Sequence, residues 1–197
     1  MRTLYILCAL SLAVYGETKF ADFPVHAVAS YAIKAEEAGL AIGLQPVEDL
    51  KDQKTYFDME LTPKGFIPVF IVIENQSKEE SFLFDKSTVT YGPADSGTAT
   101  PQVPSKLRDN GALATVASLA PGTEFIVMAK INHASHIQGN ILKRELQSRT
   151  LSPAASTHGF LYIPAPKHGP REKIRIRVPF TRTGTQESVP LVLDLVF

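Results

Sequence analysis

The run at residues 65–77 constrains the fold of this chain more than any other stretch. It reads Gly-Phe-Ile-Pro-Val-Phe-Ile-Val-Ile-Glu-Asn-Gln-Ser. Its apolar part is continuous and rich in β-branched and aromatic residues. A glycine precedes it and a polar turn follows it, which is typical of a strand with both faces buried. The run therefore predicts a β-protein with an interior strand.

Six other segments also carry strand patterns. At residues 173–180, Ile174, Ile176 and Val178 alternate with basic residues, as expected of a strand with one buried face. At residues 189–197, every second residue is apolar, namely Leu191, Leu193, Leu195 and Phe197. The remaining expected strands are residues 40–47, 81–85, 88–91 and 159–164. About seven strands are expected of an immunoglobulin-like β-sandwich, so we predict a mainly β chain with that fold.

Turns and short helices are expected between these strands. Residues 32–38 combine alanine, lysine and glutamate, and they predict a short helix that ends at Gly39. Residues 76–80 are expected to turn the buried strand into a hairpin partner at 81–85. Residues 52–61 predict a short amphipathic turn with three inward side chains, Tyr56, Phe57 and Leu61.

Residues 105–148 predict a helical insertion in a single domain of residues 17–197. The apolar residues in its second half fall on one helical stripe: Ala134, Ile137, Ile141, Leu142 and Leu146. Gly139 lies within the stripe and costs about 1 kcal/mol relative to alanine.

The first sixteen residues match a secretory signal peptide. Arg2 provides the positive charge, residues 3–15 are largely apolar, and Gly16 is a small residue before a cut at Glu17. The apolar stretch is shorter than the roughly 20 residues that span a bilayer, although an uncleaved anchor remains an alternative. We therefore expect residues 1–16 to be removed and the mature chain to be periplasmic or secreted, without a transmembrane span.

Cysteine content and charge exclude several kinds of site. The single cysteine, Cys8, lies in the predicted signal, so the mature chain has no disulfide, thiolate nucleophile or cysteine zinc site. Lysine plus arginine and aspartate plus glutamate both number 20. Such a balance gives no support to nucleic-acid binding.

The sequence also resembles a family of known proteins. Three motifs carry the resemblance: Gly-Leu-Ala-Ile-Gly-Leu-Gln-Pro at 39–46, the run at 65–77, and His-Gly-Phe-Leu-Tyr-Ile-Pro at 158–164. Together with Tyr-Phe-Asp-Met-Glu-Leu at 56–61, they resemble uncharacterised bacterial exported proteins with an immunoglobulin-like sandwich. The resemblance covers residue 39 to about residue 180. It implies the fold and the compartment, and it carries over no catalytic residue.

Few side chains form a pattern that suggests chemistry. His133 and His136 would share a helix face and could hold a metal with His158 or Glu145 as a further ligand. However, no His-Glu-x-x-His motif, Gly-x-Ser-x-Gly motif or phosphate-binding glycine loop is present. We therefore predict no metal, no cofactor and no catalytic residue.

The main candidate site is a row of basic residues on the strand at 173–180. Lys173, Arg175 and Arg177 would project from one face, about 7 Å apart. Such a row could bind an anionic lipid, a lipopolysaccharide or a peptidoglycan carboxylate. The alternative is a solvated outer face or a protected sheet edge.

These features predict a non-enzymatic, exported envelope or interaction module. Its partner would be an envelope protein or an anionic envelope component. One alternative is an envelope hydrolase or carbohydrate-active enzyme that uses His133, His136 or Glu145. Another is a lipid- or partner-binding protein that uses the helical segment at 105–148.

Overall fold

The computed structural model describes residues 20–93, 135–165 and 173–196. Several predicted features lie outside these ranges: the signal peptide at 1–16 with Cys8, residues 105–134 of the helical insertion, His133 and Phe197. The described strands are β1 (Ile33–Glu37), β2 (Leu40–Pro46), β3 (Phe66–Asn75), β4 (Phe82–Phe84), β5 (Thr90–Pro93), β6 (Arg149–Leu151), β7 (Ser156–Pro164), β8 (Lys173–Arg182) and β9 (Ser188–Val196). The helical elements are α1 (Leu50–Phe57), residues 135–144, and the single 3-10 turns η1 (Val28–Ser30), η2 (Thr62–Lys64) and η3 (Lys86–Thr88).

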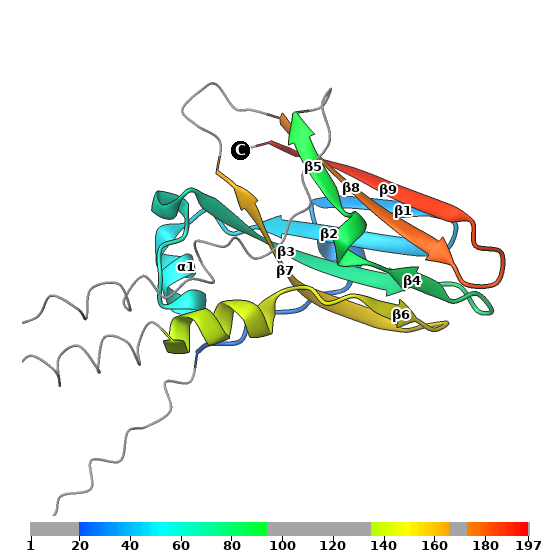
Figure 1. Ribbon diagram of the computed structural model, residues 1–197, viewed down its shortest axis with the longest axis horizontal. Helices are drawn as coiled ribbons and strands as arrows, with labels where there is room; N and C mark the ends of the chain where they lie inside the picture. Colours follow the sequence, from blue (N-terminus) through cyan, green and yellow to red (C-terminus); the bar gives the residue numbers. More distant parts are fainter. Residues whose placement is uncertain (1–19, 94–134, 166–172, 197) are drawn as a thin grey trace, which may run out of the picture.

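The strands form two antiparallel sheets, which confirms a mainly β chain (Figure 1). The first sheet has the order β1-β2-β3-β7. In the second sheet, β8 pairs with β9 along one edge, and with β4 and β5 in succession along the other. β6 completes this sheet by pairing with β4.

The facing sides of the two sheets share one hydrophobic cluster. It contains Ile67, Val69, Ile71 and Ile73 of β3 together with the alternate apolar residues of β8 and β9. The other face of the second sheet is open, because Lys173, Arg175 and Arg177 of β8 are exposed. This arrangement produces the alternating sequence pattern of β8 and β9, as predicted.

The outer face of the first sheet is covered by a second hydrophobic cluster. Phe70 and Val72 of β3, and Phe160 of β7, pack there against Phe57 of α1 and Ile141 of the 135–144 helix. Figure 1 shows both helices at the same end of the molecule. β3 is therefore buried on both faces, which confirms the prediction from its continuous apolar run.

Gln53 of α1 supplies a hydrogen bond that Pro68 of β3 lacks. Pro68 accepts a bond from the backbone N–H of Val47 (2.9 Å), but proline has no N–H to return to the Val47 carbonyl. The side-chain amide of Gln53 donates to that carbonyl instead (2.7 Å). A proline is thereby accommodated in an interior strand.

The predicted helix at 32–38 is wrong. Residues 33–37 form β1, which pairs with β2 from Ile33↔Leu44 to Glu37↔Leu40. The two-residue turn between them, Ala38 and Gly39, has positive φ at both positions (49° and 81°), as hairpin turns of the primed types require. The helix propensity of alanine, lysine and glutamate is small per residue, and pairing with β2 outweighs it.

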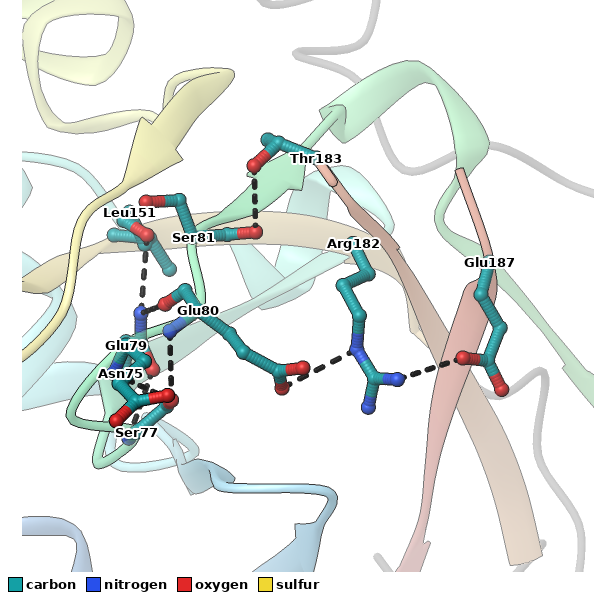
Figure 2. A network of polar contacts seen from close by, with 9 residues as sticks. All are labelled: Asn75, Ser77, Glu79, Glu80, Ser81, Leu151, Arg182, Thr183 and Glu187. Carbon is teal, nitrogen blue, oxygen red and sulfur yellow. Dashed lines mark hydrogen bonds and ion pairs between the residues drawn. The ribbon is translucent and has the colours of Figure 1, made fainter. Parts of the chain in front are cut away.

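The predicted hairpin between β3 and β4 is also wrong. Both edges of β3 are occupied, by β2 and β7, so β4 joins the other sheet. Asn75 stabilises this crossing, because its buried amide donates to the carbonyls of Glu80 (2.7 Å) and Leu151 (3.1 Å), as Figure 2 shows. Ser77 accepts bonds from the next backbone N–H groups, those of Glu79 and Glu80.

Other predicted elements are confirmed with changed bounds. Residues predicted as a turn at 52–61 include most of α1, with Phe57 and Leu61 fully buried. β7 begins before the predicted strand at 159–164, and β6 was not predicted. Of the helical insertion at 105–148, the structure describes residues 135–148, of which 135–144 are helical and 145–148 are not. Ile137 and Ile141 face the sheet, and Leu142 is exposed.

Candidate functional site

The predicted basic row on β8 is exposed, but its charges are partly compensated. Asp194 lies opposite Arg175 on β9. It forms ion pairs with Arg175 Nε (2.8 Å) and Lys173 Nζ (2.8 Å). The hydrogen bonds from Arg175 and Lys173 hold the pKa of the Asp194 carboxyl well below its usual range. Asp194 thus supplies the negative charge that an anionic ligand would bring. Anion binding by the row of Lys173, Arg175 and Arg177 stays a prediction.

Arg182, another basic residue of β8, is also ion-paired. Arg182 Nε lies 3.2 Å from a carboxylate oxygen of Glu80, and Arg182 Nη1 lies 2.7 Å from Glu187 (Figure 2). Its guanidinium also lies over the ring of Phe82, 5.9 Å from the centroid. These contacts connect the β8–β9 hairpin to the start of β4, so Arg182 has a structural role.

The predicted metal ligands do not assemble in the described part of the chain. His136 is exposed on the 135–144 helix, and His158 is exposed on β7. The described residues contain no group of three or more histidine, cysteine, aspartate or glutamate side chains that could hold a metal ion. His133 lies outside the described ranges.

Glu145 follows the 135–144 helix and forms an ion pair with Lys86 of η3. Its carboxylate lies 2.9 Å from Lys86 Nζ, and the two side chains are 5% and 24% exposed. The next residue, Leu146, donates its backbone N–H to the carbonyl of Phe160 in β7 (2.9 Å). Glu145 and Leu146 thus connect the end of the helix to η3 and to β7, and the buried Glu145 carboxylate has a partly buried cationic partner.

A groove of about 1320 Å³ lies beside this ion pair. One wall is residues 20–25, the second is the 135–144 helix with the residues that follow it, and the floor is β3 and β7. Its exposed polar lining includes His136, Lys143, Gln147, Arg149, Ser156 and His158. The groove is a concave surface with polar lining on the outer face of the first sheet.

Hydrogen bonds from two residues hold the walls of the groove together. Arg144 donates to the carbonyl of Ala21 (2.6 Å) and to the side chain of Asn140 (2.6 Å). Asn140 in turn donates to the carbonyl of Tyr56 in α1 (2.8 Å). The ring of Phe23 packs beside the ring of Phe70 (4.5 Å between centroids), below the groove. The site is therefore built on packed elements.

The charges that line the groove favour an anionic ligand. Lys143, Arg144 and Arg149 are the cationic residues, and Asp22 and Glu145 are the acidic ones. Because Lys86 compensates Glu145, the positive side chains of the groove outweigh the negative ones.

The sequence pointed to His136, Glu145 and His158 as metal-site candidates, and all three line this groove. The groove itself was missed because its walls come from residues 20–25, 135–149 and 156–160, which share no local pattern. The one sequence feature that pointed toward the groove was the apolar stripe of the 135–144 helix, because it indicated which face of the helix packs on the sheet.

The comparisons with known proteins found no relatives. No family model matches the chain, and neither a curated protein nor a solved structure matches it. In the part of the chain that the structure describes, no helix is long and apolar enough to cross a membrane.

Proposed function

We propose that this protein is an exported, non-enzymatic interaction module that binds a partner in the groove. The observation that carries the proposal is the groove itself, with a polar, mainly positive lining on a packed support. Most of its polar groups come from strands and a helix, and such support favours specific recognition.

The fold and the compartment belong to the same proposal. Two antiparallel sheets with a shared hydrophobic cluster are consistent with an immunoglobulin-like β-sandwich. The signal-like residues 1–16 support export, to the periplasm or the exterior. The resemblance to uncharacterised bacterial exported proteins supports the same fold and compartment.

The geometry favours a polar partner over a lipid surface. Ile137 and Ile141 of the 135–144 helix are buried against the sheet, and Leu142 is 37% exposed. Membrane-surface helices require a broad open apolar face. The described helix presents polar residues to the groove, such as His136 and Lys143.

Site-specific photo-crosslinking in cells tests the binding site. A photoreactive residue at Lys143 is expected to capture a discrete partner, whereas the same residue at the exposed Lys51 of α1 is not. Equal capture at both positions, or capture at neither, would contradict the proposal.

N-terminal sequencing of the exported protein tests the compartment. The mature chain is expected to begin at Glu17. A cell fraction in which the protein keeps Met1 and stays in the cytoplasm would contradict export.

A further inference from the structure

Among the described residues, no strand pairs with the outer edge of β7 where it borders the groove. β7 is the last strand of the first sheet and pairs with β3 along its inner edge. On the outer edge, Phe160 pairs with the chain at Glu145 and Leu146. Within the described ranges, no strand pairs with the outer edge at Ser156 and His158, and both residues are exposed.

The hydrogen-bond register determines which backbone groups of β7 point outward. The carbonyl of Ala155 accepts a hydrogen bond from the N–H of Asn75, the residue that ends β3. The backbone N–H and C=O groups of the odd-numbered residues in this region therefore point toward β3. The carbonyl of Phe160 accepts a hydrogen bond from the N–H of Leu146 on the other side of β7. The backbone N–H and C=O groups of the even-numbered residues therefore point away from β3. Because this direction alternates along a strand, Ser156 and His158 direct their N–H and C=O groups toward the open edge.

The neighbouring charges suggest the chemistry of a strand that could pair there. Lys143 and Arg149 line the groove beside this edge. The acidic residue nearest in sequence to them, Glu145, is ion-paired with Lys86. The groove volume of about 1320 Å³ exceeds the range of roughly 300–1,000 Å³ that is usual for small-molecule pockets. A long ligand with negative charges fits these features.

We propose that an extended, acidic segment of a partner protein adds a strand to β7 at Ser156 and His158. The backbone groups of these two residues pair with the segment, and Lys143 and Arg149 bind its carboxylates. Strand addition of this kind gains affinity from main-chain bonds and specificity from side chains. The inference rests on the proposed function and specifies the ligand of the same groove.

A synthetic peptide of alternating threonine and glutamate provides the first test. Its binding to the mature protein is measured by fluorescence anisotropy, and amide hydrogen exchange maps the contact. The acidic peptide is expected to slow exchange at Ser156 and His158, whereas a peptide with lysine in place of glutamate is not. Unchanged exchange at both residues would overturn the proposal.

Two substitutions at His158 separate the backbone from the side chain. His158→Pro removes the outward N–H while leaving the bonds to β3, because proline is tolerated at such edge positions. It is expected to weaken peptide binding about tenfold relative to His158→Ala, which retains the N–H. Circular dichroism verifies that both variants are folded. Equal affinity of the two folded variants would contradict strand addition. If His158→Pro does not fold, Ser156→Pro and Ser156→Ala make the same comparison.

Charge reversal tests the contribution of the basic residues. The double variant Lys143→Glu with Arg149→Glu is expected to reduce affinity for the acidic peptide by at least about tenfold. The control, Lys51→Glu with Lys54→Glu on α1, has the same net charge and places the change outside the groove. A similar loss in both would show a general charge effect and overturn the assignment of these residues.

Other ligand classes give distinct outcomes. Polygalacturonate and vesicles of anionic lipid are titrated against the same variants. If either binds in the groove with no difference between His158→Pro and His158→Ala, while the acidic peptide does not bind, the ligand class is wrong. Crosslinking at Lys143 would then still support the proposed function, so the two failures are distinguishable.

Discussion

The side-chain amide of Gln53 completes the hydrogen bonding of two backbone segments. It donates to Val47 O and to Thr62 Oγ1, and it accepts from the backbone N–H groups of Leu61 (2.7 Å) and Thr62 (3.0 Å). The residue is fully buried, so water does not replace these bonds. One polar side chain therefore permits both the proline in β3 and the turn after α1.

Replacing Gln53 by methionine is expected to lower the free energy of unfolding by about 3 kcal/mol. The volume is similar, but buried backbone groups lose their partners, and each such group costs about 1–3 kcal/mol. Urea denaturation measures the change. Gln45→Met at an exposed position of β2 is the matched control and should change stability by less than about 0.5 kcal/mol. Equal effects of the two substitutions would contradict this role of Gln53.

At the scale of elements, β7 shows the effect of close packing, and β8 and β9 show the effect of charge. Gly159 of β7 allows the chain at Leu146 to approach closely, since an added Cβ would lie 2.6 Å from Leu146 Cα. On β8 and β9, Asp194 joins two basic residues across the open face of the second sheet.

Gly159→Ala is expected to destabilise the protein by at least about 2 kcal/mol. The new methyl group meets backbone atoms, so Leu146 and the end of the 135–144 helix must move away from β7. Urea denaturation measures the loss, and hydrogen exchange shows whether it is concentrated at residues 135–146. Gly184→Ala, where a Cβ meets nothing within 4 Å, is the control and is expected to be nearly neutral. The prediction fails if Gly159→Ala is equally neutral.

Asp194 predicts a loss of stability in acid. Its carboxyl has a lowered pKa in the folded state because of hydrogen bonds from Arg175 and Lys173, whereas the ordinary value is 3.8. The carboxylate therefore stabilises the fold above that ordinary value, and this contribution is lost as the pH falls through the folded pKa. Urea midpoints at about pH 7 and about pH 3 measure the difference.

Asp194→Asn is expected to reduce this dependence of stability on pH. Glu60→Gln removes a different exposed carboxylate and serves as the control. An unchanged pH dependence in Asp194→Asn would show that other groups account for the acid sensitivity. Asp85 is one such group, because hydrogen bonds from Ser87 lower the pKa of its carboxyl.

At the scale of the whole molecule, the first sheet is the middle layer. One face packs against the second sheet and the other against α1 and the 135–144 helix. The ion pair of Lys86 and Glu145 connects the second sheet to the end of that helix (2.9 Å). It therefore links the outer layers and supports a wall of the groove.

Lys86→Met is expected to cost about 2–3 kcal/mol of unfolding free energy. Glu145 is 5% exposed, and a buried charge without its ion-pair partner is costly. Adding Glu145→Gln to the same variant is expected to restore part of the loss, because it removes that charge. Urea denaturation of the single and double variants measures this coupling. Strictly additive effects would contradict it.

The local pattern of apolar and polar residues predicted those strands whose sequence is determined mainly by which faces are buried. β3 is apolar throughout because both of its faces are covered, and β8 alternates because one face is open. β1 was misread as a helix, since Lys34, Glu36 and Glu37 are common in helices and pairing with β2 decided their conformation. β4 was paired with the wrong strand because the sequence does not show that both edges of β3 are taken.

The sequence by itself determined that this is a mainly β protein with an interior strand, because continuous and alternating burial leave different residue patterns. It also named three residues of the groove, His136, Glu145 and His158, though for a metal site. Only the tertiary structure decided that Asp194 compensates the basic row and that the groove exists. The physical reason is that ion pairs and grooves depend on contacts between segments distant in the sequence, and such contacts leave no local pattern of apolar and polar residues.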